Sequence, residues 1–240
     1  MLPLHNDFLL TAHRGAVDRA PENTLLAFQE AQRLGIAESE LDVRLSADGV
    51  LVIGHDYTVE NLAIGGDLVT PMSELSLEEL KRLDLGLGQT VPTFEEVLNG
   101  TDILLQVEIK DRRAARPLAE FLETRPVEDQ NRCMVTSFDP FALAEFQAHA
   151  PQLARGTGFL IWSLDSDWRH AAESLRVRNL LLHWPGLTRQ RVRSLQDEGY
   201  RVCSSMYNSA ADLRRILETG VQGSSTDRPI YAKALIESLG

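Results

Sequence analysis

The chain has 240 residues, a length that fits one large domain, because single α/β barrels commonly run to about 250 residues. Hydrophobic residues make up 43% of the sequence and charged residues 25%, which excludes a disordered or a fibrous architecture. The formal net charge of -11 excludes a surface that holds nucleic acid or anionic lipid through bulk electrostatics, so an anionic substrate needs locally placed cations.

Apolar runs of strand length recur along the whole chain. The predicted strands are Phe8–His13, Glu40–Leu45, Ile103–Lys110, Arg132–Thr136, Gly158–Trp162, Asn179–His183, Arg201–Ser205 and Gly223–Thr226. Amphipathic segments follow these runs, and this alternation predicts parallel strands connected by helices, that is, a (β/α)8 TIM barrel of the α/β class. An open doubly wound sheet is the alternative, although the sequence has no glycine-rich dinucleotide fingerprint after its first strand.

Several helix starts carry recognisable capping residues. These are Asp139 with Pro140 at the first helical position, Thr188, and Ser209 with Asp212, which resemble a capping box. The helix that starts after Ser209 is expected to end at Gly220, because glycine readily adopts the left-handed conformation that closes a helix.

The segment between the second and third predicted strands is longer than a normal crossover. It carries two capping signals of its own, Ser76 with Glu79 and Thr93 with Glu96. We therefore expect a small insertion beside the barrel at about residues 57–85, and we expect residues 1–240 to form a single domain.

Two predicted strands carry charged residues at alternate positions, although strands of a parallel sheet covered on both faces are normally apolar. Glu40 and Asp42 share one face of their strand, and Glu108 and Lys110 share one face of the next. If the apolar faces pack on helices, three carboxylates converge at the C-terminal mouth of the barrel, where barrel enzymes place their sites. Such a cluster needs a cation, and oxygen ligands favour Mg2+ or Ca2+. The alternative is that these residues are solvated or form salt bridges to helices.

Two histidines end apolar runs at the same end of the predicted barrel. His13 closes the first strand and His55 closes a second run, so together they can supply a general acid and a general base, whereas one such histidine alone is more often structural. Arg14 and Lys110 offer cations for a phosphoryl group, and the alternative for Arg14 is a surface ion pair. This combination suits phosphodiester cleavage, in which developing charge is neutralised and the leaving oxygen is protonated.

The motifs follow one another in a characteristic order. They are His13-Arg14-Gly15, Pro21-Glu22-Asn23-Thr24, Glu40-Leu41-Asp42-Val43, Asp48-Gly49, His55-Asp56 and Val107-Glu108-Ile109-Lys110. Weaker similarities extend to the end of the chain, in Pro92-Thr93-Phe94, Ser137-Phe138-Asp139-Pro140, Gly199-Tyr200, Asn208 and Thr226-Asp227-Arg228-Pro229. The set resembles the glycerophosphodiester phosphodiesterase family, closest to its bacterial cytosolic members.

The resemblance implies a barrel with a small insertion after the second strand. It implies an enzyme that converts a glycerophosphodiester and water into glycerol 3-phosphate and an alcohol such as choline, ethanolamine or glycerol. It also implies the roles of the site residues: His13 and His55 as the catalytic pair, Glu40, Asp42 and Glu108 as ligands of Mg2+ or Ca2+, and Arg14 and Lys110 as phosphate-contacting cations. Glu22 and Asn23 are expected to hold the loop after the first strand.

The sequence departs from the family where substrate preference is decided. Ser205-Met206-Tyr207-Asn208 stands where the family often has Trp-Thr-Val-Asn, so an aromatic wall for the glycerol moiety is missing at Ser205. Tyr207 and Trp184 are the candidates to replace it. Gln222-Gly223 stands for the usual Asp-Gly, and the family's common Arg-Thr-Thr-Asn-Gly run is absent after His55-Asp56.

The remaining aromatic residues and the cysteines have simpler interpretations. Trp162 and Trp168 are expected to be packing residues, and His183 is expected to be a hydrogen-bonded core residue. Cys133 and Cys203 fit no metal-ligand spacing, so both are expected to be reduced and buried.

Two other functions fit the same residues. A lysophospholipase D or a cyclising phosphodiesterase would act on a lipid, and would show an exposed apolar rim or a basic patch. A non-catalytic barrel would bind phosphodiesters, although such decay usually removes a metal ligand or a catalytic histidine. No stretch reaches the ~18 apolar residues of a membrane span, and Met1–Leu10 lacks a leader pattern. We therefore expect a cytoplasmic protein with a small-molecule substrate and neither nucleic-acid binding nor stable membrane insertion.

Overall fold

A computed structural model describes residues 8–60, 69–164, 167–183, 186–205 and 207–239. Nine strands occur in these residues and belong to one sheet: β1 (Leu9–Ala12), β2 (Glu38–Leu45), β3 (Leu51–Ile53), β4 (Leu104–Ile109), β5 (Cys133–Ser137), β6 (Gly158–Ile161), β7 (Asn179–His183), β8 (Arg201–Ser205) and β9 (Gly223–Thr226). All pairs are parallel except that of β2 with β3, and β1 pairs with both β2 and β9. The ring is therefore closed, which confirms the (β/α)8 barrel and excludes the doubly wound sheet.

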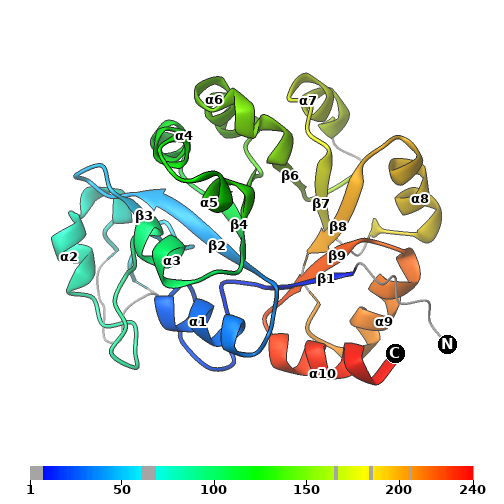
Figure 1. The fold of residues 1–240 in the computed structure, drawn as a ribbon, viewed down its shortest axis with the longest axis horizontal. Helices are drawn as coiled ribbons and strands as arrows, with labels where there is room; N and C mark the ends of the chain where they lie inside the picture. Colours follow the sequence, from blue (N-terminus) through cyan, green and yellow to red (C-terminus); the bar gives the residue numbers. More distant parts are fainter. Residues whose placement is uncertain (1–7, 61–68, 165–166, 184–185, 206, 240) are drawn as a thin grey trace.

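Helices connect the strands and surround the barrel (Figure 1). They are α1 (Leu25–Arg33), α2 (Leu77–Lys81), α3 (Phe94–Gly100), α4 (Ala115–Glu123), α5 (Val127–Asn131), α6 (Pro140–His149), α7 (Trp168–Ser174), α8 (Arg189–Asp197), α9 (Ala210–Thr219) and α10 (Pro229–Leu239), with short 3-10 helices η1 (Met72–Glu74), η2 (Arg112–Ala114) and η3 (Pro151–Gly156). The side chains of Asp139, Thr188 and Ser209 each accept a backbone N–H at a helix start, as predicted. Helix α9 ends at Gly220, whose φ is 83°.

Alternation along the strands separates the packing residues from the polar ones. Leu41 and Val43 are fully buried in the main hydrophobic cluster, whereas Glu40 and Asp42, on the opposite face of β2, point into the barrel. The helices contribute large side chains to the same cluster, among them the fully buried Phe28, Phe94 and Phe146. Burial of each such ring stabilises the fold by about 1.5–3 kcal/mol, and this packing fixes the strands that carry the polar residues.

The chain leaves the barrel after β2 and builds a smaller hydrophobic cluster. Strand β3 pairs antiparallel with β2, and α2 begins at the predicted capping box of Ser76 with Glu79. The second cluster consists of Val52, Val59, Met72, Leu80, Leu85 and Val91. It therefore involves β3 as well as the segment predicted as an insertion, and β3 is a short strand additional to the eight that were predicted.

Gly15 brings the loop after β1 close to α1. Its φ is 88°, and an added Cβ would lie 2.7 Å from the Cβ and 2.8 Å from the carbonyl carbon of Ala27. We expect Gly15→Ala to lower the free energy of unfolding by about 2–4 kcal/mol, since the left-handed backbone and the overlap both oppose a side chain. Gly49→Ala is the matched control, with a φ of 82° and no atom within 4 Å, and its expected cost is about 1 kcal/mol. Urea denaturation of both variants measures the difference, and equal losses would contradict the expectation.

The cysteines differ from each other in burial. Both are free, and burial raises the pKa of each thiol to about 12. Cys203 is buried as predicted, but Cys133, the first residue of β5, is only partly buried, so that part of the prediction was wrong.

In the described part of the chain, no helix combines the length and the hydropathy needed to cross a membrane. The cytoplasmic location stays a prediction.

Candidate active site

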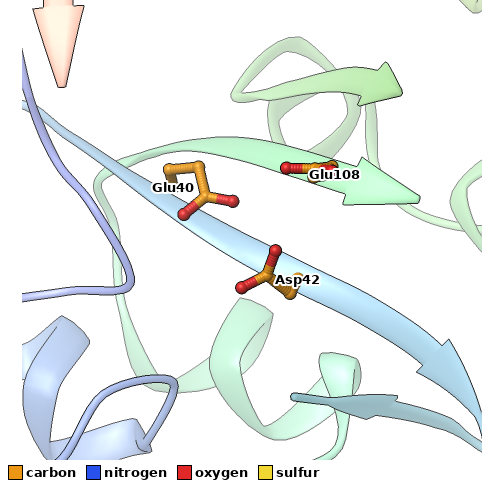
Figure 2. A group of neighbouring side chains, drawn as sticks. All are labelled: Glu40, Asp42 and Glu108. Carbon is orange, nitrogen blue, oxygen red and sulfur yellow. The ribbon is translucent and has the colours of Figure 1, made fainter. Parts of the chain in front are cut away.

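Three buried carboxylates from two neighbouring strands face one another inside the barrel (Figure 2). The register of β2 and β4 places Asp42 directly beside Glu108, and Glu40 lies on the same face of β2 as Asp42. Each of the three residues offers an oxygen within 4.8 Å of the others. The predicted convergence of the carboxylates is therefore present, and the alternative of solvated or helix-facing residues does not hold.

The three carboxylates are buried close together, so their negative charges would repel one another strongly. Burial raises the pKa of Glu40 well above its usual range, and the charges of Asp42 and Glu108 add to the effect. Burial and the charge of Asp42 also raise the pKa of Glu108. For Asp42, burial opposes ionisation, but Lys110 and Arg14 outweigh it and lower the pKa. Burial and mutual repulsion thus oppose ionisation of Glu40 and Glu108, and a bound cation would relieve both effects.

Two oxygen atoms of the cluster accept no hydrogen bond from the described residues, namely Glu40 Oε1 and Asp42 Oδ1, although Asp42 Oδ1 lies 3.4 Å from the ammonium of Lys110. The other oxygens of these groups are held, because Glu40 Oε2 accepts the backbone N–H of Arg14 at 3.1 Å and Asp42 Oδ2 accepts from Asn23 Nδ2 at 2.8 Å. A buried acceptor without a donor costs about 1–3 kcal/mol. An oxygen-only set with lone pairs to spare fits a hard divalent cation such as Mg2+ or Ca2+.

The two predicted phosphate-contacting cations lie beside the carboxylates and line the same cavity. Arg14 Nη1 donates to both carboxylate oxygens of Glu22, at 2.9 and 3.0 Å, and its Nε lies 3.4 Å from Asp42 Oδ2. Lys110 Nζ lies 2.8 Å from Glu108 Oε1 and 3.4 Å from Asp42 Oδ1. Arg14 therefore does form an ion pair, but at the mouth of the barrel rather than on an unrelated surface. Contact of either cation with phosphate stays a prediction.

Each of the two predicted catalytic histidines is held by an aspartate through its Nδ1 atom. His13 Nδ1 lies 2.6 Å from Asp227 Oδ1, and His55 Nδ1 lies 2.7 Å from Asp56 Oδ1. The His13 ring turns its other nitrogen, Nε2, toward the carboxylate cluster, 3.7 Å from Glu40 Oε2. Both histidines line the cavity with Glu40, so the structure brings the two rings and the cluster together as the sequence predicted.

Asp227 is a site residue to which the sequence analysis assigned no role. The hydrogen bond from His13 lowers its pKa, so Asp227 is ionised at neutral pH. Its second oxygen accepts from Asn208 Nδ2 at 2.8 Å, and Asn208 Oδ1 accepts the backbone N–H of Asp227 at 3.0 Å. Asp227 directly follows β9, and an acidic residue at that end of a barrel strand was the available signal.

The loop that Glu22 and Asn23 were expected to hold is tied to the site by both residues. Besides the pair of Glu22 with Arg14, the backbone N–H of Asn23 donates to the carbonyl of Arg14 at 3.0 Å. The Asn23 side chain bonds Asp42, as described above. This loop geometry agrees with the expectation from the sequence.

The aromatic residues near the mouth differ from the expectations. Trp162 is 66% exposed and lines the cavity, so its prediction as a packing residue was wrong, whereas Trp168 is buried. His183 is exposed at the mouth and is not a core residue, because β7 ends there. Tyr207 is buried in the main cluster, so it does not replace the missing aromatic wall, and Trp184 lies outside the described residues.

Comparisons with known proteins agree with this geometry. The sequence model of the glycerophosphoryl diester phosphodiesterase family matches residues 13–231. A glycerophosphodiester phosphodiesterase of Caldanaerobacter subterraneus subsp. tengcongensis is 31% identical, with 92% of this chain and 94% of the relative covered.

Solved structures of phosphodiesterases have the same fold as this chain. A phosphodiesterase of Oleispira antarctica, solved in complex with the product sn-glycerol-3-phosphate, is 27% identical with a TM-score of 0.85 over 95% of this chain and 96% of that one. A glycerophosphodiester phosphodiesterase of Thermotoga maritima is 26% identical with a TM-score of 0.78 over 96% of this chain and 100% of that one. With its barrel, its carboxylate cluster and its two histidines, the chain belongs to the glycerophosphoryl diester phosphodiesterase family.

Proposed function

We propose that the protein hydrolyses glycerophosphodiesters to glycerol 3-phosphate and an alcohol, and that it uses Mg2+ or Ca2+ bound by Glu40, Asp42 and Glu108. Membership of the family makes the protein a glycerophosphodiester phosphodiesterase. The observation that carries the metal dependence is the group of three buried carboxylates, with two oxygens that accept no hydrogen bond from the described residues. We further propose that the barrel and the segment at residues 57–85 work as one catalytic domain.

The hydrogen bonds of His13 and His55 leave one ring nitrogen of each available for proton transfer. An ionised carboxylate only accepts, so the Nδ1 atom that faces Asp227 or Asp56 carries a hydrogen. The Nε2 atom of each ring then accepts a proton in the neutral state and donates one in the charged state. We propose that one histidine removes a proton from the attacking nucleophile, either water or the neighbouring glycerol hydroxyl, while the other protonates the leaving alcohol oxygen. Attack by water gives glycerol 3-phosphate directly, whereas attack by the hydroxyl gives a cyclic phosphate that water then opens to glycerol 3-phosphate.

The charged residues hold the phosphate between the two histidines. When bound, the divalent cation would withdraw negative charge from a phosphoryl oxygen. Lys110 contacts a further oxygen as a point charge, and burial opposes its charge, yet Asp42 and Glu108 raise its pKa and keep it protonated. Arg14, oriented by Glu22, adds a second fixed cation.

The test is release of glycerol 3-phosphate from glycerophosphocholine, glycerophosphoethanolamine and bis-glycerophosphate. We expect release with Mg2+ or Ca2+ and a loss of at least about 100-fold in EDTA, restored by added cation, because the cation stabilises charge that develops in the transition state. A full rate with saturating EDTA would contradict metal dependence. Cleavage of a lysophospholipid but of none of the three diesters would favour the lipid-directed alternative, and no cleavage of any substrate would favour a binding protein.

A further inference from the structure

The cavity at the mouth has a second half that the proposed chemistry does not use. The charged groups come from β1, β2 and β4 and the segments that follow them. The opposite half is lined by Phe138, Leu160, Trp162, Leu181 and His183, together with Ser204, Ser205 and Ser225. Of the described residues that line this half, none is an acid, a lysine or an arginine. This half therefore suits a part of the substrate that needs neither a carboxylate nor a basic partner.

Two aromatic rings form a plate on this side of the cavity. The Trp162 and Phe138 rings are stacked, with centroids 4.8 Å apart and planes inclined by 11°. The His183 ring lies beside Trp162 at 5.3 Å and is inclined by 62°. Phe138 covers one face of the indole, yet Trp162 remains 66% exposed, so much of the ring surface is open at the mouth. A stacked indole with an open face beside the proposed reaction centre is suited to contact a substrate.

The Phe138 ring of the plate lies near Lys110, a cation of the charged half of the cavity. Lys110 Nζ, which lies in the carboxylate cluster, is 6.0 Å from the centroid of the Phe138 ring. A phosphoryl group bound at Lys110 therefore has the plate within reach of the first few atoms of its ester alcohol. In choline, the nitrogen follows the ester oxygen by only two carbons.

The chemistry of this half distinguishes between alcohols. A primary ammonium has three N–H donors and glycerol has hydroxyl groups, and both lose hydrogen bonds where acceptors are scarce. Among the described residues, the side-chain acceptors of this half are serine hydroxyls and the His183 ring, with no carboxylate: Ser204 Oγ donates to Ser224 Oγ at 2.8 Å and Ser205 Oγ lies 3.5 Å from His183 Nδ1. A quaternary ammonium has no N–H group, and its methyl groups and charge both favour the face of an indole.

We propose that Trp162, backed by Phe138, binds the alcohol half of the diester and selects an alcohol with a quaternary ammonium group. The inference rests on the proposed function, because it concerns the same cavity. It makes Trp162 the residue that decides between substrates which share the glycerol phosphate half.

The test compares three diesters that differ only in the alcohol: choline, ethanolamine, and 3,3-dimethylbutanol, the uncharged carbon isostere of choline. We expect the wild-type protein to have the highest kcat/KM for the choline diester. Trp162→Ala should lower this value about tenfold, mainly through KM. It should lower the value for the isostere less, because the isostere shares only the methyl contacts, and change that for the ethanolamine diester by less than about twofold. Trp162→Phe should retain part of the preference. Phe141→Ala is the matched control, since Phe141 is also 66% exposed but does not line the cavity, and it should change nothing.

The possible outcomes separate this inference from the proposed function. Equal losses for all three diesters in Trp162→Ala would place the ring against the shared glycerol half and overturn the inference. If the isostere were as good a substrate as the choline diester, Trp162 and Phe138 would recognise the shape of the alcohol and not its charge. That result would also overturn the inference. No hydrolysis of any diester by the wild-type protein would overturn the proposed function itself. Thermal unfolding of Trp162→Ala should match that of the wild type, because the side chain is largely exposed.

Discussion

Glu40→Gln is expected to lower metal-dependent kcat by at least about 100-fold while leaving the metal-free protein at least as stable as the wild type. The loss follows from removing a proposed ligand of a cation that would stabilise transition-state charge by several kcal/mol. The retained stability follows from electrostatics. Burial and the charges of Asp42 and Glu108 raise the pKa of Glu40, so a negative charge at this position is unfavourable in the metal-free protein, and a neutral amide avoids it. The amide oxygen can still accept the N–H of Arg14.

Thermal unfolding with EDTA and with saturating Mg2+ or Ca2+ separates the two effects. Cation should raise the Tm of the wild type and leave that of Glu40→Gln unchanged, because a ligand that binds only the folded state stabilises it. Glu38→Gln is the matched control: Glu38 is also buried on the same face of β2, but it accepts from Thr11 and lies outside the cluster. It should keep both turnover and the metal response. A cation-induced rise in Tm that survives in Glu40→Gln would place the cation elsewhere.

The carboxylate cluster was predictable because it depends on local geometry. Side chains alternate along every strand, so Glu40 and Asp42 had to share a face once β2 was recognised. Strands that follow each other through a right-handed crossover are neighbours in most sheets, so Glu108 on β4 was expected beside them. The pairing of Asp42 with Glu108 agrees with both rules.

The partner of His13 was not predictable in the same way. His13 and Asp227 are 214 positions apart, and they meet only because the closure of the barrel makes β1 and β9 neighbours. The sequence predicted a barrel, but not the register of the closing pair.

The environment of Trp162 was missed for a different reason. Strand β6 ends at Ile161, one residue before the predicted end, so Trp162 belongs to the loop at the mouth and not to the strand. Period-two alternation no longer applies there, and its exposure depends on the stack with Phe138.

His13→Ala is expected to lower kcat by about 100-fold or more, because we propose that the ring takes part in proton transfer. Asp227→Asn should lower kcat by about tenfold with little change in KM. The carboxylate accepts from both His13 Nδ1 and Asn208 Nδ2, whereas an amide has one oxygen and must present its NH2 group to one of these donors. The imidazole is then misoriented or takes the other tautomer, although the side chain keeps its size.

The two substitutions should not be additive. Asp227 acts through the imidazole, so Asp227→Asn should change kcat by less than twofold when His13 is already alanine. Single-turnover measurements on the four proteins of this cycle give the coupling, and their Tm values show whether each one is folded. If the loss in the double variant equalled the product of the two single losses, Asp227 would contribute independently of His13. The hydrogen bond between them would then orient nothing that the reaction needs, and the closure of the barrel at β1 and β9 would serve stability alone.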